Sequence, residues 1–421
     1  MLIEFKVTNF RSFREAQTLS MVASSIAERT ESNTFDPNLK GFGRFLRSAV
    51  VYGPNAAGKT NLLRALRFMK VAVMTSSGTA PTNKPRHEPF KLAAKSRREP
   101  TEFQATFVEG GIRYEYGFSL DAERIRTEWL VEYAHQRGRA LFERRYDEKK
   151  KDYEWKFSSY LKGNRSTWSA STHQNALFLS TAVTLNSAQL LPVFKWFQHR
   201  LVVVVGNTTL NETLTIKMLS DPNTKEKILP FLKEADLGIT DFELSREQMP
   251  QQAQAVMVQG AQPMFIEQAP GAAHLVKVIF THASTEEGEQ AQFNFEDESS
   301  GTQQFFRSVG AWLNVLTNGE VLLVDEIDAS LHPLLTKFLV DKFHSDENPK
   351  NAQLIFNTHS TALLDQDIFR RDQIWFVEKD RAGASTLYPL TDFKPRAEEA
   401  LERGYLKGRY GALPILGGRP Q

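Results

Sequence analysis

The chain has 421 residues, of which 41% are hydrophobic and 24% are charged, with 52 lysines and arginines against 50 aspartates and glutamates. This length favours two or three domains, or one large domain with insertions, and it allows a core that needs no disulfide or zinc staple. The net charge of +2 excludes a uniformly basic nucleic-acid coat. The absence of cysteine excludes disulfides, zinc–thiolate sites, iron–sulfur clusters and cysteine nucleophiles.

The first residues carry charges, Glu4 and Lys6, where a signal peptide needs an apolar core. The longest purely apolar runs, at residues 201–205 and 321–324, are far shorter than a membrane span. We therefore expect a cytoplasmic protein that does not enter a membrane.

The first third of the chain predicts two kinds of β-structure around one helix. Residues 2–9 alternate apolar and polar side chains, as a half-buried strand does. A second strand is expected at residues 49–52, before a glycine-rich turn and a helix over residues 60–73. Residues 75–100 are rich in Ser, Thr, Pro, Lys and Arg, which is typical of an exposed loop. Alternation over residues 102–157 then predicts an antiparallel sheet.

The middle of the chain predicts a helical lobe. Apolar residues recur at helical spacing over residues 165–240. Residues 248–268 are rich in Gln and Ala with scattered prolines, which favours an exposed hairpin or irregular insertion. Alternation resumes at residues 275–281 and 291–295, and a helix is expected after Gly301.

The last third returns to alternating strands and helices. A buried strand is expected at residues 321–324, a helix at 334–344, and strands at 354–356 and 373–378. Because these strands come so long after the one at 49–52, we expect an α/β fold in which one nucleotide-binding sheet is split by a long insertion. The expected divisions are the first part of the head at 1–164, an inserted lobe at 165–295 and the second part of the head at 296–421.

The strongest motif is Gly53-Pro54-Asn55-Ala56-Ala57-Gly58-Lys59-Thr60, a full match to the phosphate-binding loop. The glycines let backbone N–H groups point at phosphate oxygens, and the helix that follows adds its positive dipole end. Lys59 is expected to reach the β- and γ-phosphates, and the Thr60 hydroxyl to ligate Mg²⁺. A functionless glycine turn is the alternative, and the strand before and helix after it argue against this. The residues expected to bind ATP are Gly53, Asn55, Ala56, Ala57, Gly58, Lys59, Thr60 and Asn61.

A pair of carboxylates, Asp325 and Glu326, follows the buried strand at 321–324. Successive side chains at a strand end point in different directions, so the two acids serve different partners. Asp325 is expected to hold Mg²⁺, and Glu326 to polarise the water that attacks the γ-phosphate. Two solvated acids that cap a strand are the alternative.

Two weaker motifs accompany these. His359 directly follows the strand at 354–356, where a neutral imidazole can contact the γ-phosphate or the attacking water. A lone histidine is ordinarily a surface or core residue, but its position after the phosphate loop and the acid pair favours a catalytic role. Ser300 and Gly301 begin a helix, where small residues make an anion site, although a simple N-cap explains them equally well.

Together these motifs resemble the ATPase head of the ABC superfamily, in the branch that contains SMC, RecF and OLD-type proteins. Residues 7–13 are similar to the first strand of that branch, residues 325–333 to its Walker B motif and D-loop, and residues 299–303 to its signature, with Thr302 in place of the second glycine. The whole chain resembles, more closely, the stand-alone AAA-type ATP-binding proteins of the RloA and AbiL-like group. Further similar segments lie at residues 89–92, 175–180, 372–376 and 409–414.

The resemblance implies an ABC/SMC-type P-loop ATPase head with an inserted antiparallel sheet and a compact helical lobe. Two heads would face each other head-to-tail, with each ATP between the phosphate loop of one subunit and Ser300 and Gly301 of the other. Hydrolysis at Glu326 would release the pair. Arg11, just past the first strand, is expected to contact the nucleotide of its own subunit, with a plain surface arginine as the alternative. The glutamine that senses Mg²⁺ in the family has no secure counterpart.

The chain lacks both the long coiled coil of SMC proteins and the acidic nuclease domain of OLD proteins. The resemblance therefore implies an ATP-driven switch, as a dimer or higher oligomer, that controls a separately encoded effector, a nuclease in phage defence. The alternative is a RecF- or SMC-like ATPase that binds DNA in repair or recombination through the basic clusters at residues 84–98 and 144–151. Solvated loops explain these clusters better, because acids interrupt the second one.

Overall fold

The computed structural model describes residues 1–134, 137–205, 215, 218, 222–235, 237–248, 265–269, 272–284, 289–329, 331–396 and 399–414. The chain divides into two compact units, the first made of residues 1–205, 319–327 and 340–421, and the second of residues 206–318 and 328–339.

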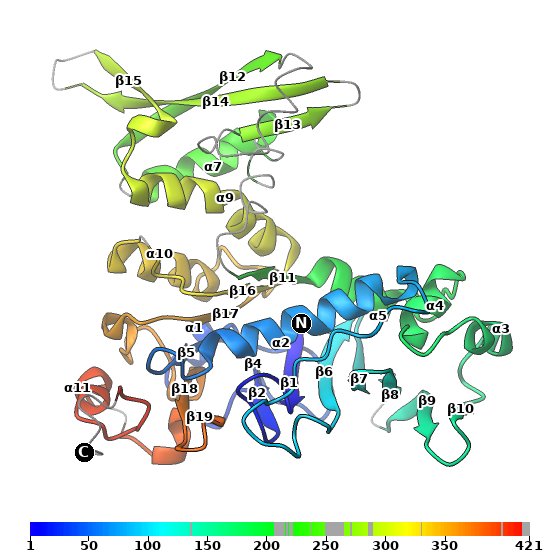
Figure 1. The fold of residues 1–421 in the computed structure, drawn as a ribbon. Helices are drawn as coiled ribbons and strands as arrows, with labels where there is room; N and C mark the ends of the chain where they lie inside the picture. The colour runs from blue at the N-terminus through cyan, green and yellow to red at the C-terminus, as the bar shows by residue number, and fades with distance from the viewer. Residues whose placement is uncertain are drawn as a thin grey trace. The chain divides into compact units, whose positions relative to one another are not determined.

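A six-stranded sheet forms one layer of the first unit (Figure 1). Its strands, in spatial order, are β11 (Leu201–Val204), β16 (Val321–Val324), β17 (Gln353–Asn357), β5 (Ser48–Tyr52), β18 (Ile374–Lys379) and β19 (Ser385–Pro389). Neighbours pair in parallel except β18 and β19, which are antiparallel. Every residue of β5 and β17 is buried, as expected for strands covered on both faces. The expectation of one sheet split by a long insertion is confirmed.

One strand of this sheet lies where the sequence predicted helix. Residues 201–204 fall inside the segment expected to be helical, but they form β11, which pairs in parallel with β16 from Leu201 opposite Val321 to Val204 opposite Val324. Three consecutive valines are stiff at χ1 and favour an extended backbone. The helical expectation is therefore wrong for this run, because the sheet edge supplies it with a partner from more than a hundred residues away.

A seven-stranded antiparallel sheet forms the second layer of the first unit. Its strands, in spatial order, are β10 (Asp152–Phe157), β9 (Arg139–Asp147), β8 (Ile125–Tyr133), β7 (Ile112–Leu120), β6 (Thr101–Glu109), β1 (Leu2–Thr8) and β2 (Gln17–Ser20). The antiparallel sheet expected at residues 102–157 is thus confirmed, and the first strand of the chain belongs to it by pairing with β6. The α/β fold class with an inserted antiparallel sheet is confirmed.

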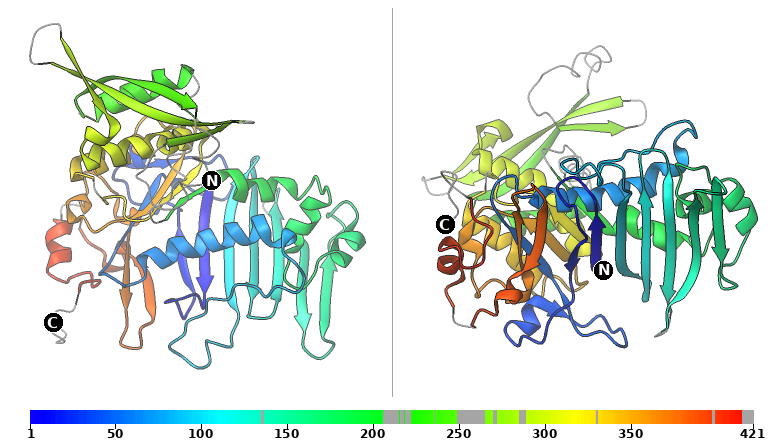
Figure 2. Two further views of the ribbon diagram at one scale, coloured as in Figure 1. Left: turned by 45° about the horizontal axis from the view of Figure 1, so that its top comes forward. Right: turned by 60° about the horizontal axis from the view of Figure 1, so that its bottom comes forward.

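Helix α2 (Lys59–Thr75) runs along the antiparallel sheet in Figures 1 and 2 and shares one core with both sheets. That core includes Val51 and Ile355 of the parallel sheet and Phe5 and Phe103 of the antiparallel sheet. The buried residues of the helix are Lys59, Leu62, Leu63, Ala65, Leu66, Met69 and Val73. Their spacing of three and four residues places them on one face, and the opposite face is exposed.

Short helices and turns complete the first unit. They are α1 (Thr30–Asn33), η1 (Ser76–Gly78), α3 (Arg165–Ala170), α4 (Phe178–Thr184), α5 (Leu191–Lys195), the π-helical turn η2 (Trp196–Arg200), η4 (Thr361–Leu363), η5 (Arg371–Gln373), η6 (Leu390–Phe393) and α11 (Leu401–Leu406). Strand β3 (Thr34–Phe35) directly follows α1 in the sequence and pairs with β4 (Phe45–Leu46) in a small antiparallel ribbon. Helix α10 (Pro333–His344) spans the boundary between the two units.

A buried carboxylate fixes the start of α4 to the antiparallel sheet. Both oxygens of Glu128 on β8 are used: Oε2 accepts the Phe178 amide at 2.7 Å, and Oε1 accepts the Leu179 amide and the Tyr116 hydroxyl at 3.0 Å each. The guanidinium of Arg144 on β9 lies 3.0 Å from Oε2, and neither side chain is exposed. Helix α4 therefore depends on an ion pair that water does not screen.

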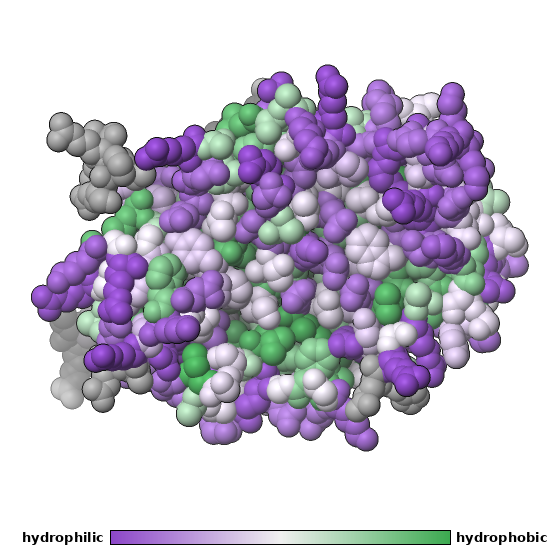
Figure 3. All heavy atoms as spheres, turned by 90° about the horizontal axis from the view of Figure 1, so that it is seen from below, coloured by the Kyte–Doolittle hydropathy of each residue, from purple (hydrophilic) through white to green (hydrophobic). Residues whose placement is uncertain are grey.

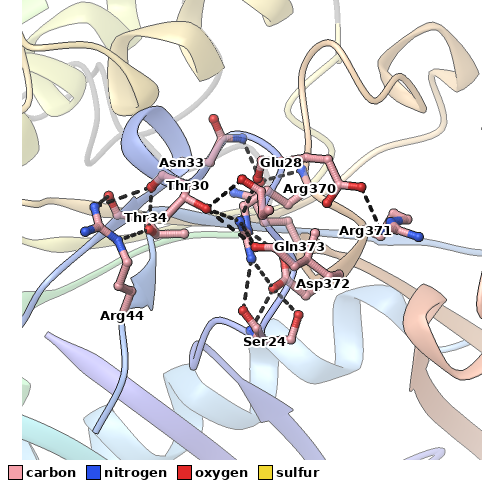
Figure 4. Close-up of polar contacts among 12 residues, drawn as sticks. Ser24, Glu28, Thr30, Asn33, Thr34, Arg44, Arg370, Arg371, Asp372 and Gln373 are labelled. Carbon is pink, nitrogen blue, oxygen red and sulfur yellow. Dashed lines mark hydrogen bonds and ion pairs between the residues drawn. The ribbon is translucent and has the colours of Figure 1, made fainter. Parts of the chain in front are cut away.

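A second buried network holds the segment before β3 against the end of the parallel sheet (Figure 4). The Arg370 guanidinium pairs with Asp372 at 2.8 Å and donates to the carbonyl oxygens of Ile26 at 2.9 Å and Glu28 at 2.6 Å. Asp372 also accepts both the amide and the hydroxyl of Ser24. The sequence motif at residues 372–376 therefore has a structural role at its first position.

The second unit contains more β-structure than the expected helical lobe. Helices α7 (Pro222–Glu234) and α9 (Ser300–Asn318) accompany a four-stranded sheet of β12 (Ile239–Gln248), β14 (Ala272–Ala283), β13 (Phe265–Ala269) and β15 (Gln290–Asn294), with the turn η3 (Phe295–Asp297). Phe306 of α9 packs edge-on against Phe242 and Phe280 of this sheet. Most of the insertion predicted at residues 248–268 lies outside the described residues.

The units divide the chain at positions other than the expected boundaries at 165 and 295. Residues 165–205 lie in the first unit because Phe178 and Trp196 are buried in its core. Helix α9 lies in the second unit, where Phe305 packs with Phe231 and Phe338. The helical signal was correct for α3, α4, α5 and α9, but periodicity alone does not show which core a helix covers.

Hydrophilic side chains cover most of the face in Figure 3, with apolar residues in small groups between them. Large exposed apolar side chains among the described residues include Leu92 and Leu334, each 69% exposed. Within the described part of the chain, no helix combines the length and the apolar character that a membrane crossing requires.

The Glu128 network generates a stability prediction. Glu128→Gln leaves the buried Arg144 charge unpaired, so we expect a loss of about 3–5 kcal/mol in the free energy of unfolding of the first unit. Urea unfolding followed by far-ultraviolet circular dichroism measures the shift in midpoint.

Glu132→Gln on the same strand is the control, because this half-buried carboxylate is not part of the network. The two variants remove the same charge from β8. Equal midpoints for the two variants would contradict the importance assigned to the buried pair.

Candidate ATP-binding site

The phosphate loop, Gly53–Thr60, connects β5 to α2 and is closely packed at its two glycines. A Cβ atom at Gly53 would lie 2.2 Å from the carbonyl oxygen of Val377. Gly58 has a φ of +120°, and a Cβ there would lie 2.6 Å from the Ser385 hydroxyl. Both positions therefore exclude any side chain, which explains why the motif needs glycine at these two places.

Lys59 is buried, and its ammonium group closes over the loop. It donates to the carbonyl oxygens of Gly53 at 2.7 Å and Pro54 at 3.2 Å. Asn55 and Ala56 lie exposed at the tip, and Ala56 has a left-handed φ of +60°. The ammonium is thus already positioned inside the loop by backbone oxygens, where it can exchange these weak acceptors for phosphate oxygens.

Two serines outside the motif hold the loop in place. The Ser385 hydroxyl on β19 donates to the Ala57 carbonyl oxygen, and the Ser385 amide donates to the Ser12 carbonyl oxygen at 2.7 Å. Asn61 donates its side-chain amide to the Ser12 hydroxyl at 2.8 Å. Asn61 therefore joins the loop to the turn after β1. No sequence motif predicts Ser385, since it is an isolated serine in a short strand.

The acid pair meets the phosphate loop through Asp325. The Thr60 hydroxyl donates to Asp325 Oδ1 at 2.9 Å, and the Asn357 side-chain amide donates to the same oxygen at 2.6 Å. Asn357 also accepts the backbone amide of Glu326 at 2.6 Å through its own Oδ1. Glu326 has a left-handed φ of +53°, and its side chain is exposed. One amide side chain thus fixes both acids.

The order of the strands explains this convergence. β17 lies between β16 and β5, and parallel strands end at the same edge of a sheet. Asn357 is the last residue of β17, so its side chain reaches the acids that follow β16, and its carbonyl oxygen accepts the Ile327 amide at 3.2 Å. The sequence pattern singled out His359 in this turn and gave no role to Asn357.

Thr60 and Asp325 supply a hydroxyl and a carboxylate, the oxygen ligands that Mg²⁺ prefers. Magnesium in such sites is bound by one or two carboxylates together with substrate phosphates, and this donor set fits that pattern. Among the residues that the structure describes, no group of three His, Cys, Asp or Glu side chains forms an all-protein metal site. Any Mg²⁺ here would therefore depend on the nucleotide as well as on these two residues.

His359 is presented at the same edge by a turn anchored on both sides. Thr358 is buried, and its hydroxyl accepts the Ser360 amide at 3.0 Å. The Tyr52 hydroxyl at the end of β5 donates to the Ser360 carbonyl oxygen at 3.3 Å. The imidazole between these anchors is exposed at the edge where the acid pair and the phosphate loop lie. Its contact with a γ-phosphate stays a prediction.

Arg11 is engaged elsewhere than at the phosphate loop. Its Nε lies 2.5 Å from Glu88 Oε2, and Arg86 pairs with the other oxygen of the same carboxylate. Its backbone has a left-handed φ of +52°, and its amide donates to the Glu88 carbonyl oxygen at 2.8 Å. The adjacent Ser12 contacts the loop, so this turn does adjoin the site. A direct contact of Arg11 with ATP stays a prediction.

Ser300 and Gly301 lie at the start of α9 in the second unit. Ser299 makes the N-terminal hydrogen bonds: its hydroxyl accepts the Thr302 amide at 3.1 Å and lies 2.9 Å from the Thr302 hydroxyl. Ser300 is consequently not needed as a cap and is exposed. Its role toward the ATP of a second copy stays a prediction.

Several cations of the two basic clusters, residues 84–98 and 144–151, are paired with carboxylates of this chain. Arg144 is fully buried against Glu128, so the cluster at residues 144–151 does not begin with a surface cation. In the other cluster Lys84 pairs with Glu123 at 2.7 Å and Lys95 with Glu99 at 3.3 Å. Neither cluster presents a continuous row of unpaired cations.

Comparison with known families identifies the chain. Residues 48–365, more than half of it, match the family described as "AAA domain, putative AbiEii toxin, Type IV TA system". The chain belongs to this AAA family. The matched segment of this family member begins with β5 and the phosphate loop and ends after the His359 turn. No curated protein matched the sequence.

Three solved structures are similar to this AAA family member in outline. An SMC head domain from Thermotoga maritima covers 92% of this chain and 98% of its own, at 11% identity and a TM-score of 0.41. An SMC head bound to the C-terminal winged-helix domain of ScpA covers 92% of this chain and 96% of its own, at 14% identity and a TM-score of 0.44. An SMC head with an extended coiled coil, bound to the C-terminal domain of ScpA from Pyrococcus furiosus, covers 92% of this chain and 95% of its own. Its identity is 11% and its TM-score is 0.38. At TM-scores below 0.5 the likeness supports no statement about function.

The position of Asn357 leads to a test of the site. Asn357→Ala removes the bond that holds Asp325 and the one that fixes the Glu326 backbone. Since each such hydrogen bond contributes about 1–3 kcal/mol, we expect kcat for ATP to fall by about 10- to 100-fold, with a smaller change in ATP affinity. Steady-state ATP hydrolysis and binding of a fluorescent ATP analogue measure the two effects.

Asn164→Ala is the matched control, because Asn164 is exposed at the start of α3 and its side chain caps nothing. We expect wild-type kinetics for it. If Asn357→Ala keeps the wild-type kcat, the amide does not organise the acids during hydrolysis.

Proposed function

We propose that the protein binds ATP with Mg²⁺ and hydrolyses it, and that this cycle switches the association of two copies. The observation that carries the proposal is the joint geometry of the phosphate loop and the acid pair, with Thr60 bonded to Asp325 and Asn357 linking Asp325 to Glu326. In this arrangement Lys59 binds the β- and γ-phosphates, Thr60 and Asp325 hold the metal, and Glu326 polarises the attacking water.

Exposure of the hydrolytic residues supports a second copy as part of the active site. Glu326 and His359 are both exposed, although phosphoryl transfer is favoured where water is excluded except for the attacking molecule. Ser300, at the N-terminus of α9, is also exposed. We infer that a second copy, oriented head-to-tail, covers the γ-phosphate with its Ser300 and Gly301.

We further propose that the ATP-bound assembly controls a separately encoded effector, a nuclease in phage defence. The family description, which names a toxin and a "Type IV TA system", supports a role with a second component.

DNA repair is the less supported alternative. It needs a surface that contacts many phosphates, and Arg144 and Lys84 are both held by carboxylates. Salt-dependent binding of duplex DNA by the ATP-bound protein would favour this alternative. Co-purification with a separate nuclease in the presence of ATP would favour the switch.

The general-base assignment predicts the behaviour of Glu326→Gln. This variant keeps the side-chain shape but cannot accept a proton, so hydrolysis should fall by about 100-fold or more while ATP still binds. Size-exclusion chromatography with light scattering should then show a stable ATP-dependent dimer or larger assembly.

Lys59→Ala is the comparison variant, because it should bind no ATP and stay unassembled. A wild-type rate of hydrolysis by Glu326→Gln would show that another group activates the water.

The head-to-tail arrangement predicts a different result for Ser300→Arg. A long cation at the start of α9 should spare ATP binding by one copy but obstruct the second, so hydrolysis should fall by about 10-fold or more. Thr317→Arg, exposed near the opposite end of the same helix, is the matched control.

Mixing Ser300→Arg with Lys59→Ala tests whether the two motifs act from different copies. In a mixed dimer one of the two sites combines an intact loop with an intact Ser300, so partial activity should return. Unchanged hydrolysis by Ser300→Arg alone would remove this segment from the active site.

A further inference from the structure

A cavity of about 710 Å³ lies on the exposed face of α2 in the first unit. Its walls come from α2, from the turn after β1, from the loop at residues 79–88 and from the segment before α4. No residue of the phosphate loop, Gly53–Thr60, lines it. Its volume falls within the range of about 300–1,000 Å³ that is typical of small-ligand sites.

Cations dominate the polar wall of this cavity. Arg64 and Arg67 lie three residues apart on α2, and residues at this spacing are neighbours on a helix surface. Both are exposed, and within the described part of the chain no hydrogen bond or ion pair holds either guanidinium. Arg11 and Arg86 share the single carboxylate of Glu88. The cavity therefore carries an excess of positive charge that attracts a multivalent anion.

The remainder of the wall is apolar and partly aromatic. Phe10, Phe68, Val71 and Leu120 line the cavity; Val71 is 48% exposed and Phe68 is half-buried, whereas Phe10 and Leu120 are buried. The Arg11 guanidinium, a planar group, lies 5.7 Å from the centre of the Phe10 ring. Such surfaces accept a planar ring by stacking, and arginine planes and aromatic rings are the usual platforms for an unpaired base.

A buried asparagine holds the loop at residues 79–88 at the edge of the cavity. Asn175 lines the cavity and is only 7% exposed. Its Nδ2 donates to the carbonyl oxygens of Pro81, at 3.0 Å, and Asn83, which fixes the orientation of the amide. Its Oδ1 is buried and accepts no hydrogen bond.

We propose that this cavity is a second nucleotide-binding site, apart from the phosphate loop, that takes the phosphates and the unpaired base of a nucleotide. The phosphates bind Arg64 and Arg67, and the base lies on the apolar wall. A base within a duplex cannot enter, because its faces are stacked and its pairing edge is occupied. The ligand is thus a free nucleotide or a segment of single-stranded nucleic acid, which share this chemistry.

The experiment uses the full chain with Lys59→Ala, which separates this site from the phosphate loop. The probe is a 5′-phosphorylated tetra-adenylate RNA with a 3′ fluorophore, and binding is followed by anisotropy. Arg64→Ala with Arg67→Ala should weaken binding by about 30-fold or more, because two charge-assisted contacts are lost. Alanine at these exposed helical positions should preserve the fold, which a thermal melt confirms.

Arg97→Ala with Arg98→Ala is the matched control, since it removes the same charge from exposed positions outside the cavity and should leave affinity within about twofold. Competition by unlabelled AMP equal to that by the tetramer would identify a free nucleotide as the ligand, and competition by the tetramer alone a single strand.

Three results would overturn the proposal. They are unchanged affinity in the Arg64→Ala and Arg67→Ala variant, equal binding of a blunt RNA duplex, and loss of ATP affinity when the same two substitutions are made with Lys59 intact. The last result would make the cavity part of the ATP site. Since the assay uses a chain that cannot hydrolyse ATP, failure of the proposed ATPase switch would not affect its outcome.

Discussion

The arrangement of the candidate ATP-binding site depends on the side chain of Asn357. Its amide group donates to Asp325 and accepts from the Glu326 backbone, and Thr60 completes the set through Asp325. Three strands that are far apart in the sequence, β5, β16 and β17, are thereby joined at the edge where the phosphate loop begins. The bond from the Glu326 amide to Asn357 helps to offset the left-handed conformation of Glu326, which costs of order 1–2 kcal/mol in an L-residue.

Helix α2 connects this edge to the remainder of the first unit. Its first residue is the lysine of the phosphate loop, its buried face packs in the core shared by both sheets, and its exposed face carries Arg64 and Arg67. The position of the loop is therefore determined by the packing of a long helix rather than by the loop alone. Ser12 and Ser385 add a bond from each side, so the loop is held by segments from both sheets.

Much of the fold follows from local pattern. Strict alternation located β6 to β10, and the phosphate-loop motif located the end of β5 and the start of α2, because each signal arises from neighbours in the sequence. β11 was missed because a run of valines is compatible with either a buried strand or a helix until its partner is known. The division into units was missed for a similar reason, since Phe178 and Trp196 show helical spacing but no preference for one core.

The same limit applies to the site. Motifs predicted the residues that carry charge, since Lys59, Asp325 and Glu326 stand at fixed positions after strands. These residues are positioned by Asn357, Ser12 and Ser385, which are uncharged and belong to other segments of the chain. No sequence motif therefore predicts them. Arg144 shows the opposite case, because a basic run in the sequence concealed a fully buried ion pair.

Exposure of Glu326 finally constrains how the protein works. A carboxylate open to bulk water has many water molecules to orient and little electrostatic advantage over the solvent, because a high dielectric weakens every contact with the developing charge. If Glu326 acts as proposed, the phosphate loop of one copy alone would bind ATP more readily than hydrolyse it. Closure by another surface would lower the dielectric around the γ-phosphate and make hydrolysis conditional on assembly. Under the proposed function, a single chain would bind ATP and hydrolyse it only after association with another copy, as a switch requires.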